Sequence, residues 1–188
     1  MSMRALLLGA LAIGCGGSTP PPVMAATQVM GSFLDKPFTA TQAVAFSAPG
    51  SLGAVGMVVI STSAGLCSAL QAGHLPPESR NLVIEVFDLD ATSHSTAPAS
   101  PGRYLVTDQV LGPDRLAGCS YVETDAACRF LASESSVVQT GIVTLTDVAS
   151  DVYAGSLSIS MNPQDSAFGT IQSAPCPGAS LARPAPGC

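Results

Sequence analysis

Apolar and polar side chains alternate along most of this chain, and turn-forming residues interrupt the alternation at short intervals. Successive side chains of a β-strand point to opposite faces, so alternation with a period of two predicts half-buried strands. Residues 38–46 show this alternation, whereas residues 54–61 form the continuous apolar run typical of a strand buried on both faces. The other predicted strands are residues 28–34, 82–89, 103–110, 137–146, 152–161 and 168–173, with a short hairpin over residues 119–131.

One helix is predicted, over residues 66–72. Leu66 and Leu70 share one face, Gly73 can cap the C-terminal end, and a Pro-Pro pair soon afterwards prevents any continuation. About eight to nine strands with so little helix predict an all-β fold. We expect an antiparallel β-sandwich or barrel that also carries disulfides.

The N-terminal end of the chain has the pattern of an export signal. One positive charge, on Arg4, precedes an apolar run over residues 5–13, and Gly14 and Cys15 follow. A helix of nine residues rises about 14 Å, less than half of the roughly 30 Å hydrocarbon core of a bilayer, so the run is too short to span it. A charged start followed by a short apolar run predicts a cleavable secretion signal.

Residues 11–15, Leu-Ala-Ile-Gly-Cys, resemble the lipobox of bacterial lipoproteins. The resemblance implies a signal peptide over residues 1–14, cleavage before Cys15 and attachment of diacylglycerol to the Cys15 thiol. Ala12 departs from the pattern, which more often has leucine there. Gly16 stands where an acidic residue is associated with retention in the inner membrane, so the resemblance implies the outer membrane. The alternative is an ordinary signal cut after Ala26.

The composition after Cys15 predicts three segments. Residues 15–26 are rich in glycine and proline and form a tether, in which glycines give flexibility and the proline run favours an extended conformation. Such a tether can span on the order of 30 Å. Residues 27–176 form a single β domain, and residues 177–188 form a proline-rich tail.

The net charge excludes one class of partner. Loss of Arg4 with the signal leaves six basic residues against thirteen acidic ones, a formal charge of −7. An acidic surface repels phosphate backbones, which argues against nucleic-acid binding. It also argues against docking on anionic headgroups, so the lipid is expected to hold the protein at the membrane, where a protein partner in the envelope is possible.

Five cysteines remain once Cys15 carries lipid, and an oxidising compartment predicts disulfides among them. A hairpin centred between Glu123 and Thr124 places Cys119 opposite Cys128, at a separation that suits a disulfide. The odd number leaves one thiol unpaired or bonded between chains.

The arrangement of the other cysteines resembles an uncharacterised type of all-β envelope lipoprotein. In those proteins a cysteine at a helical turn and another just after the last strand tie the sheet together. The resemblance implies a disulfide between Cys67 and Cys176. The residues themselves leave open the rival pair of Cys176 with Cys188, with Cys67 as a buried thiol.

No motif in the chain carries a recognisable chemistry, so we predict no catalytic residue, metal site or cofactor. The chain has no Cys-x-x-Cys and only two histidines, which argues against zinc. His74 and His94 have no evident catalytic partner, and we expect His74 to contact the last carbonyls of the helix. Asp88 and Asp90 have the spacing of calcium ligands, but the glycine and glutamate of an EF-hand loop are missing.

Glycan binding receives little support from the aromatic residues. The chain has no tryptophan, the residue that most often forms flat platforms for sugars, and its tyrosines are Tyr104, Tyr121 and Tyr153. We expect these tyrosines to pack on strand faces with hydrogen-bonded hydroxyls.

Three functions remain open. The favoured one is a lipid-anchored envelope protein whose β domain binds a partner or has a structural role. The second is a secreted hydrolase that uses a histidine or carboxylates, and it requires a pocket that holds His74 or His94 beside an acid. The third is a carrier of an apolar ligand inside a β-barrel. Fold alone does not decide between them.

Overall fold

The protein is all-β with one short helix, which confirms the prediction from the alternating pattern. The computed structural model describes residues 26–98, 100–107, 115–134 and 140–181, and these contain thirteen strands and helix α1 (Leu66–Gln71). The strands are β1 (Gln28–Phe33), β2 (Lys36–Ala40), β3 (Gln42–Gly50), β4 (Gly53–Ser61), β5 (Arg80–Leu89), β6 (Ser95–Thr96), β7 (Gly102–Val106), β8 (Arg115–Thr124), β9 (Phe130–Glu134), β10 (Thr140–Ala149), β11 (Val152–Ser160), β12 (Ser166–Gln172) and β13 (Ala174–Pro175).

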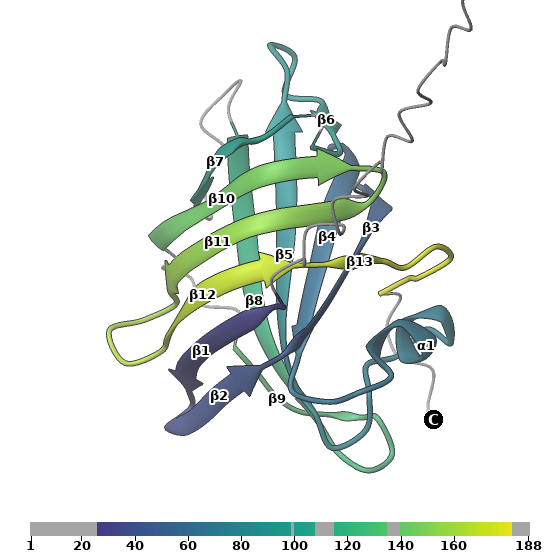
Figure 1. Cartoon of the computed structure of the whole chain (residues 1–188), viewed down its shortest axis with the longest axis vertical. Helices are drawn as coiled ribbons and strands as arrows, with labels where there is room; N and C mark the ends of the chain where they lie inside the picture. Colours follow the sequence, from purple (N-terminus) through teal and green to yellow (C-terminus); the bar gives the residue numbers. More distant parts are fainter. Residues whose placement is uncertain (1–25, 99, 108–114, 135–139, 182–188) are drawn as a thin grey trace, which may run out of the picture.

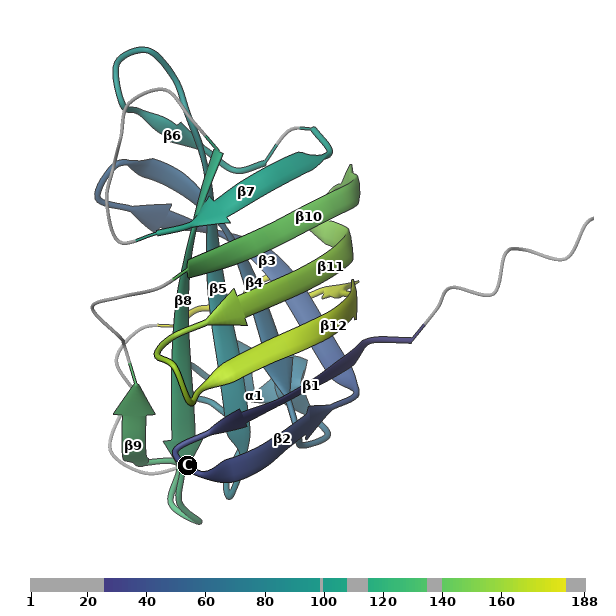
Figure 2. The ribbon, with the colours of Figure 1, turned by 90° about the vertical axis from the view of Figure 1, so that its left-hand side faces the viewer.

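All of these strands belong to one sheet that curls into a half-barrel (Figure 1). Strands β3, β4, β5 and β8 form a back layer, and β7, β10, β11, β12, β1 and β2 form a front layer that crosses it (Figure 2). The two layers join where β7 pairs in parallel with β8. We expected a sandwich or barrel of eight to nine strands; the strand number is wrong, and the sheet is a curled half-barrel and not a sandwich.

The strand number is higher than predicted because residues 38–46 bend into two strands, and because β6 and β13 lie outside the predicted strands. Thr41 alone separates β2 from β3, and Ser173 alone separates β12 from β13. Each bend carries the chain from the front layer to the back layer, and β13 then pairs in parallel with β3 at Ala174 and Val44. The period-two pattern of residues 38–46 runs through the bend at Thr41, so the pattern does not reveal that bend.

The space between the two layers holds the main core. Phe33 stacks on Tyr121 with ring centroids 4.5 Å apart, and Phe38 meets both rings edge-on. Such aromatic pairs add stabilisation beyond their buried area. The other large side chains of this core include Val29, Val58, Ile60, Leu82, Ile84, Val86, Tyr104, Val143, Leu145, Tyr153, Leu157, Ile159 and Ile171.

The back layer is buried on its second face as well. Helix α1 and the segment after β13 cover this face, and they enclose a second apolar cluster that includes Met57 and Val59 of β4. Seven consecutive residues of β4 are buried, which confirms the prediction for residues 54–61. No helix within the described ranges is both long and apolar enough to cross a bilayer.

A disulfide between Cys67 and Cys176 fastens α1 to the end of the sheet, as the resemblance implies. Its Cα atoms are 5.6 Å apart, and 109 positions separate the two cysteines in the chain. Beyond Cys176, the backbone N–H of Ser180 donates to the carbonyl of Leu70, so the start of the predicted tail packs against the helix. Cys188 lies outside the described residues.

The predicted Cys119–Cys128 disulfide is wrong. Cys119 points into the main core from β8, opposite Ile84 of β5 in the strand register, and it is a buried thiol. Cys128 lies in the β8–β9 turn with φ 57° and is itself disulfide-bonded. The hairpin is centred further along than predicted because the Asp125 carboxylate accepts the backbone N–H groups of Ala127 and Arg129, which fixes the turn there.

Candidate functional site

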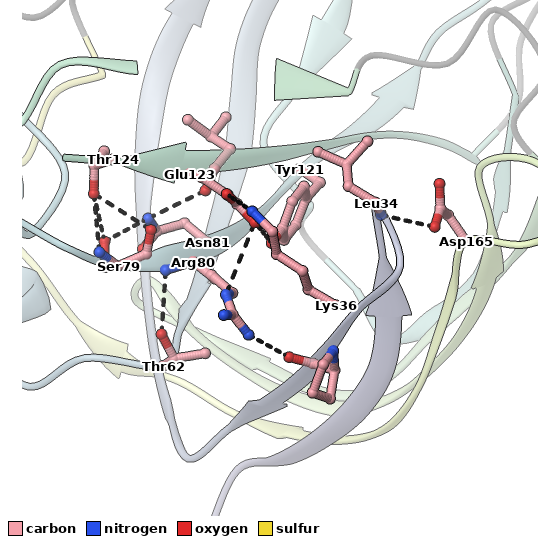
Figure 3. Close-up of polar contacts among 12 residues, drawn as sticks. Leu34, Lys36, Thr62, Ser79, Arg80, Asn81, Tyr121, Glu123, Thr124 and Asp165 are labelled. Carbon is pink, nitrogen blue, oxygen red and sulfur yellow. Dashed lines mark hydrogen bonds and ion pairs between the residues drawn. The ribbon is translucent and has the colours of Figure 1, made fainter. Parts of the chain in front are cut away.

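The buried carboxylate of Glu123 is the centre of a polar cluster at one end of the half-barrel (Figure 3). Glu123 is only 6% exposed. Lys36 Nζ donates a 2.6 Å hydrogen bond to its Oε2 atom, and the Tyr121 hydroxyl donates a 2.7 Å bond to its Oε1 atom. Arg80 Nε lies 3.8 Å from Oε1. One carboxylate is therefore shared by two cations and a phenol.

Three strands place these groups. Tyr121 and Glu123 are two residues apart on β8, so their side chains point to the same side of the sheet. Arg80 begins β5 and is paired with Glu123 in the register of the two strands. Lys36 begins β2, directly after the tight turn of Leu34 and Asp35, which both have positive φ as two-residue hairpin turns require.

The surroundings keep Glu123 ionised and Tyr121 protonated. Burial pushes the Glu123 pKa upward, but the hydrogen bonds from Lys36 and Tyr121, together with the Lys36 and Arg80 charges, bring it below its usual value. Burial and the hydrogen bond to Glu123 raise the pKa of Tyr121. Since an ionised, fully engaged carboxylate is a poor proton acceptor, the geometry favours attachment of the layers to each other over acid–base chemistry.

Further polar contacts surround this cluster. Arg80 Nη1 donates to the Pro37 carbonyl at 2.6 Å, which adds a second link between β5 and β2. The backbone N–H of Leu34 donates to Asp165 Oδ1 at 2.9 Å, and this bond ties the β1–β2 turn to the loop before β12. These contacts join four separate parts of the chain at this end of the half-barrel: the β1–β2 hairpin, β5, β8 and the loop before β12.

A buried network of neutral groups continues beside the ion pairs. The Ser79 hydroxyl donates to the Pro76 carbonyl at 2.6 Å, and Asn81 Nδ2 donates to Ser79 Oγ at 2.7 Å. The backbone N–H of Ser79, just before β5, donates to Thr124 Oγ1 at 3.1 Å, and the backbone N–H of Thr124 donates to the Ser79 carbonyl at 3.0 Å. The Asn81 Oδ1 atom is buried and has no partner in the part of the chain that the structure describes.

A shallow cleft of about 300 Å³ opens next to this network. Arg80, Glu123 and Thr124 form its inner wall, and Leu131, an exposed apolar residue, forms part of its rim. Asp125 also lines the cleft, but it is paired with Arg129 at 2.7 Å. The polar groups of Glu123, Thr124 and Asp125 on its walls are already engaged within the protein, so the cleft does not by itself identify a ligand.

A second cleft, of about 410 Å³, lies beside the Cys67–Cys176 disulfide. Uncharged residues from the segment before β1, from β3 and from α1 form its walls, together with Gln172 at the end of β12. Neither His74 nor His94 lines this cleft or the cleft at Glu123.

Both histidines lie in loops. The His74 ring contacts the carbonyl of Leu75 through Nδ1 at 2.9 Å, whereas its backbone N–H bonds to the carbonyl of Ala69. The expected contact to the helix carbonyls is therefore made by the backbone and not by the ring. His94 is exposed beside Gly53, in the loop that leads into β6.

Asp88 and Asp90, which have the spacing of calcium ligands, lie apart from the polar cluster at Glu123. Asp90 Oδ1 accepts hydrogen bonds from Thr92 and from the backbone of His94, which is a local turn. Asp88 Oδ2 lies 3.9 Å from Arg115 Nε, with which it forms an ion pair. Among the described residues, no group of three or more His, Cys, Asp or Glu side chains is placed to hold a metal ion.

Tyrosine hydroxyls are bonded as predicted, and Cys15 lies outside the described residues. Tyr104 donates to the Ser100 carbonyl at 3.1 Å, and buried Tyr153 shares a side-chain hydrogen bond with Ser47. Sequence reasoning missed the pairing of Lys36 with Glu123, because 87 residues separate them. One signal was available: Lys36 is the only lysine in the chain.

Comparisons with known proteins gave no match, whether with family models, with curated proteins or with solved structures.

Proposed function

We propose that this chain is an exported protein, anchored to the bacterial envelope by lipid on Cys15, whose β domain has a non-enzymatic binding or structural role. The observation that carries the proposal is the sequence of residues 1–15, where a charged start, a short apolar run and Gly14-Cys15 follow one another. Two or more acyl chains hold a protein stably at a bilayer, since each buried CH₂ contributes about 0.8 kcal/mol.

The domain itself supports a rigid binding module. The buried carboxylate of Glu123 is engaged by Lys36, Tyr121 and Arg80 and thereby joins the layers. Neither of the two described clefts holds a histidine beside a carboxylate, so neither of them supports the hydrolase alternative. Aromatic and branched side chains fill the space between the layers, which gives little support to a carrier of an apolar ligand.

Fractionation of cells that express the full chain tests this proposal. Wild-type protein is expected in the outer-membrane fraction, where detergent but not high salt releases it. Cys15→Ser is expected to lose the anchor. Gly16→Asp serves as a matched control, because it keeps the lipid while the resemblance implies retention in the inner membrane. Wild-type protein that is soluble and behaves like Cys15→Ser would overturn the proposal.

A further inference from the structure

The outer surface of the front layer is a regular array of mostly uncharged side chains. Along each strand, alternate residues such as Val29, Val143, Leu157 and Ala167 point into the core, so their neighbours point outward. The strand register aligns the outward residues in three rows, which we call the front face. The rows are Arg103, Thr144, Ser156, Thr170 and Gln28; Leu105, Ile142, Ser158, Phe168, Met30 and Thr39; and Thr140, Ser160, Ser166, Ser32 and Pro37.

The middle row of the front face is apolar where it crosses β12 and β1. Phe168 and Met30 are directly opposite each other in the register, and they are 55% and 48% exposed. Leu105, at the far end of the same row, is 43% exposed. Hydroxyl groups from serine and threonine border this row on both sides.

None of the three rows of the front face carries an acidic side chain. Its one charge is the positive charge of Arg103, and Asp147 lies at its margin, opposite Ala154. The chain as a whole has a formal charge of −6. Other acidic side chains lie on the back layer, in turns or in loops: Asp35, Glu78, Glu85, Asp88, Asp90, Glu123, Asp125, Asp151 and Asp165.

The anchor joins the domain at this same face. Strand β1 belongs to the front layer and begins at Gln28, directly after the first described residues. The tether of residues 15–26 can span on the order of 30 Å, so lipid on Cys15 keeps the front face within reach of the bilayer surface.

We propose that the front face docks on the lipid bilayer that holds the anchor; this inference rests on the proposed lipidation of Cys15. Phe168 and Met30 enter the boundary between headgroups and acyl chains, while the hydroxyl rows bond to headgroup oxygens. Arg103 meets a lipid phosphate. The acidic surfaces elsewhere are repelled by anionic headgroups, so only this side of the domain can approach the bilayer closely.

Single tryptophans provide the test, because the chain contains none. The lipidated full chain is prepared as Phe168→Trp, as Met30→Trp and as the control Phe130→Trp. Phe130 is 48% exposed, but it lies on β9, which pairs with the back layer (Figure 2). Each variant is bound to vesicles of phosphatidylethanolamine and phosphatidylglycerol, with or without brominated acyl chains, and tryptophan emission is recorded.

The inference predicts that brominated lipid quenches F168W and M30W by about half or more and shifts their emission to shorter wavelength, while F130W is unchanged. Equal emission in both kinds of vesicle for F168W and M30W would overturn it while leaving the anchor intact. A blue shift without quenching would overturn it in favour of a second protein copy on this face. Failure of the wild-type chain to float with vesicles would instead overturn the lipid anchor, and the inference with it.

Discussion

Lys36 Nζ and Glu123 Oε2 lie 2.6 Å apart although 87 residues separate them in the chain. The pair joins the first residue of β2, at the edge of the front layer, to the end of β8 in the back layer. Arg80 and Tyr121 contact the same carboxylate from β5 and β8. One buried carboxylate thus links the two layers at this end of the half-barrel.

Replacing Lys36 with methionine is expected to destabilise the fold. The change leaves Glu123 buried without its closest cation, and an uncompensated buried acceptor costs about 1–3 kcal/mol. Urea unfolding at neutral pH measures the loss. Arg129→Met is the matched control, because its ion pair with Asp125 is made by an arginine that is 75% exposed. An exposed pair contributes about 0–1 kcal/mol, so equal losses in both variants would contradict the role given to Lys36.

The pH dependence of stability follows from the titration of the Glu123 carboxylate. The pKa of Glu123 is lower in the folded protein than its ordinary value. The ionised carboxylate therefore contributes fully to the free energy of unfolding when the pH is above the ordinary pKa, and this contribution is lost as the pH falls through the folded pKa. Urea unfolding between pH 6 and pH 3 is expected to show a smaller acid-induced loss for Glu123→Gln than for the wild type. Identical slopes would show that Glu123 does not titrate in this range.

Removal of the Cys67–Cys176 disulfide is expected to cost about 4–5 kcal/mol in the chain-entropy model, because the bridge closes a long loop. The double variant Cys67→Ser/Cys176→Ser is compared with the wild type by thermal and urea unfolding. A double variant as stable as the wild type would show that the bridge adds nothing to the fold.

Cys119 is expected to resist alkylation in the native protein. Its thiol is buried, and burial together with the Glu85 charge raises its pKa to about 12. Only the thiolate reacts readily with iodoacetamide, so modification at pH 8 should require unfolding. Mass spectrometry after alkylation with and without urea measures this directly, and rapid labelling of folded protein at Cys119 would contradict the assigned position.

The sequence predicts the strands well where a single period-two run stays in one layer. The hairpin of β10 and β11 was predicted from such runs, and its two-residue turn at Ser150 and Asp151 has the positive φ values that the turn requires. Where the run of residues 38–46 bends between layers at Thr41, the alternation continues, so the sequence pattern does not reveal the bend.

The cysteines and the polar cluster show the limits of local patterns. The predicted Cys119–Cys128 pair assumed a hairpin centre that the side chain of Asp125 moves further along the chain. The contact of Lys36 with Glu123 depends on how the front layer folds over the back layer, which no local spacing specifies. Long-range order of this kind follows from the topology of the sheet.

Lipidation of Cys15 is the central claim, and the intact mass of the protein purified from membranes tests it most directly. We expect a species that begins at Cys15 and carries the added mass of acyl chains. After reduction and alkylation, the number of added groups should also count the disulfides. A soluble species without acyl mass that begins further along the chain would contradict the account and make this a freely secreted β domain.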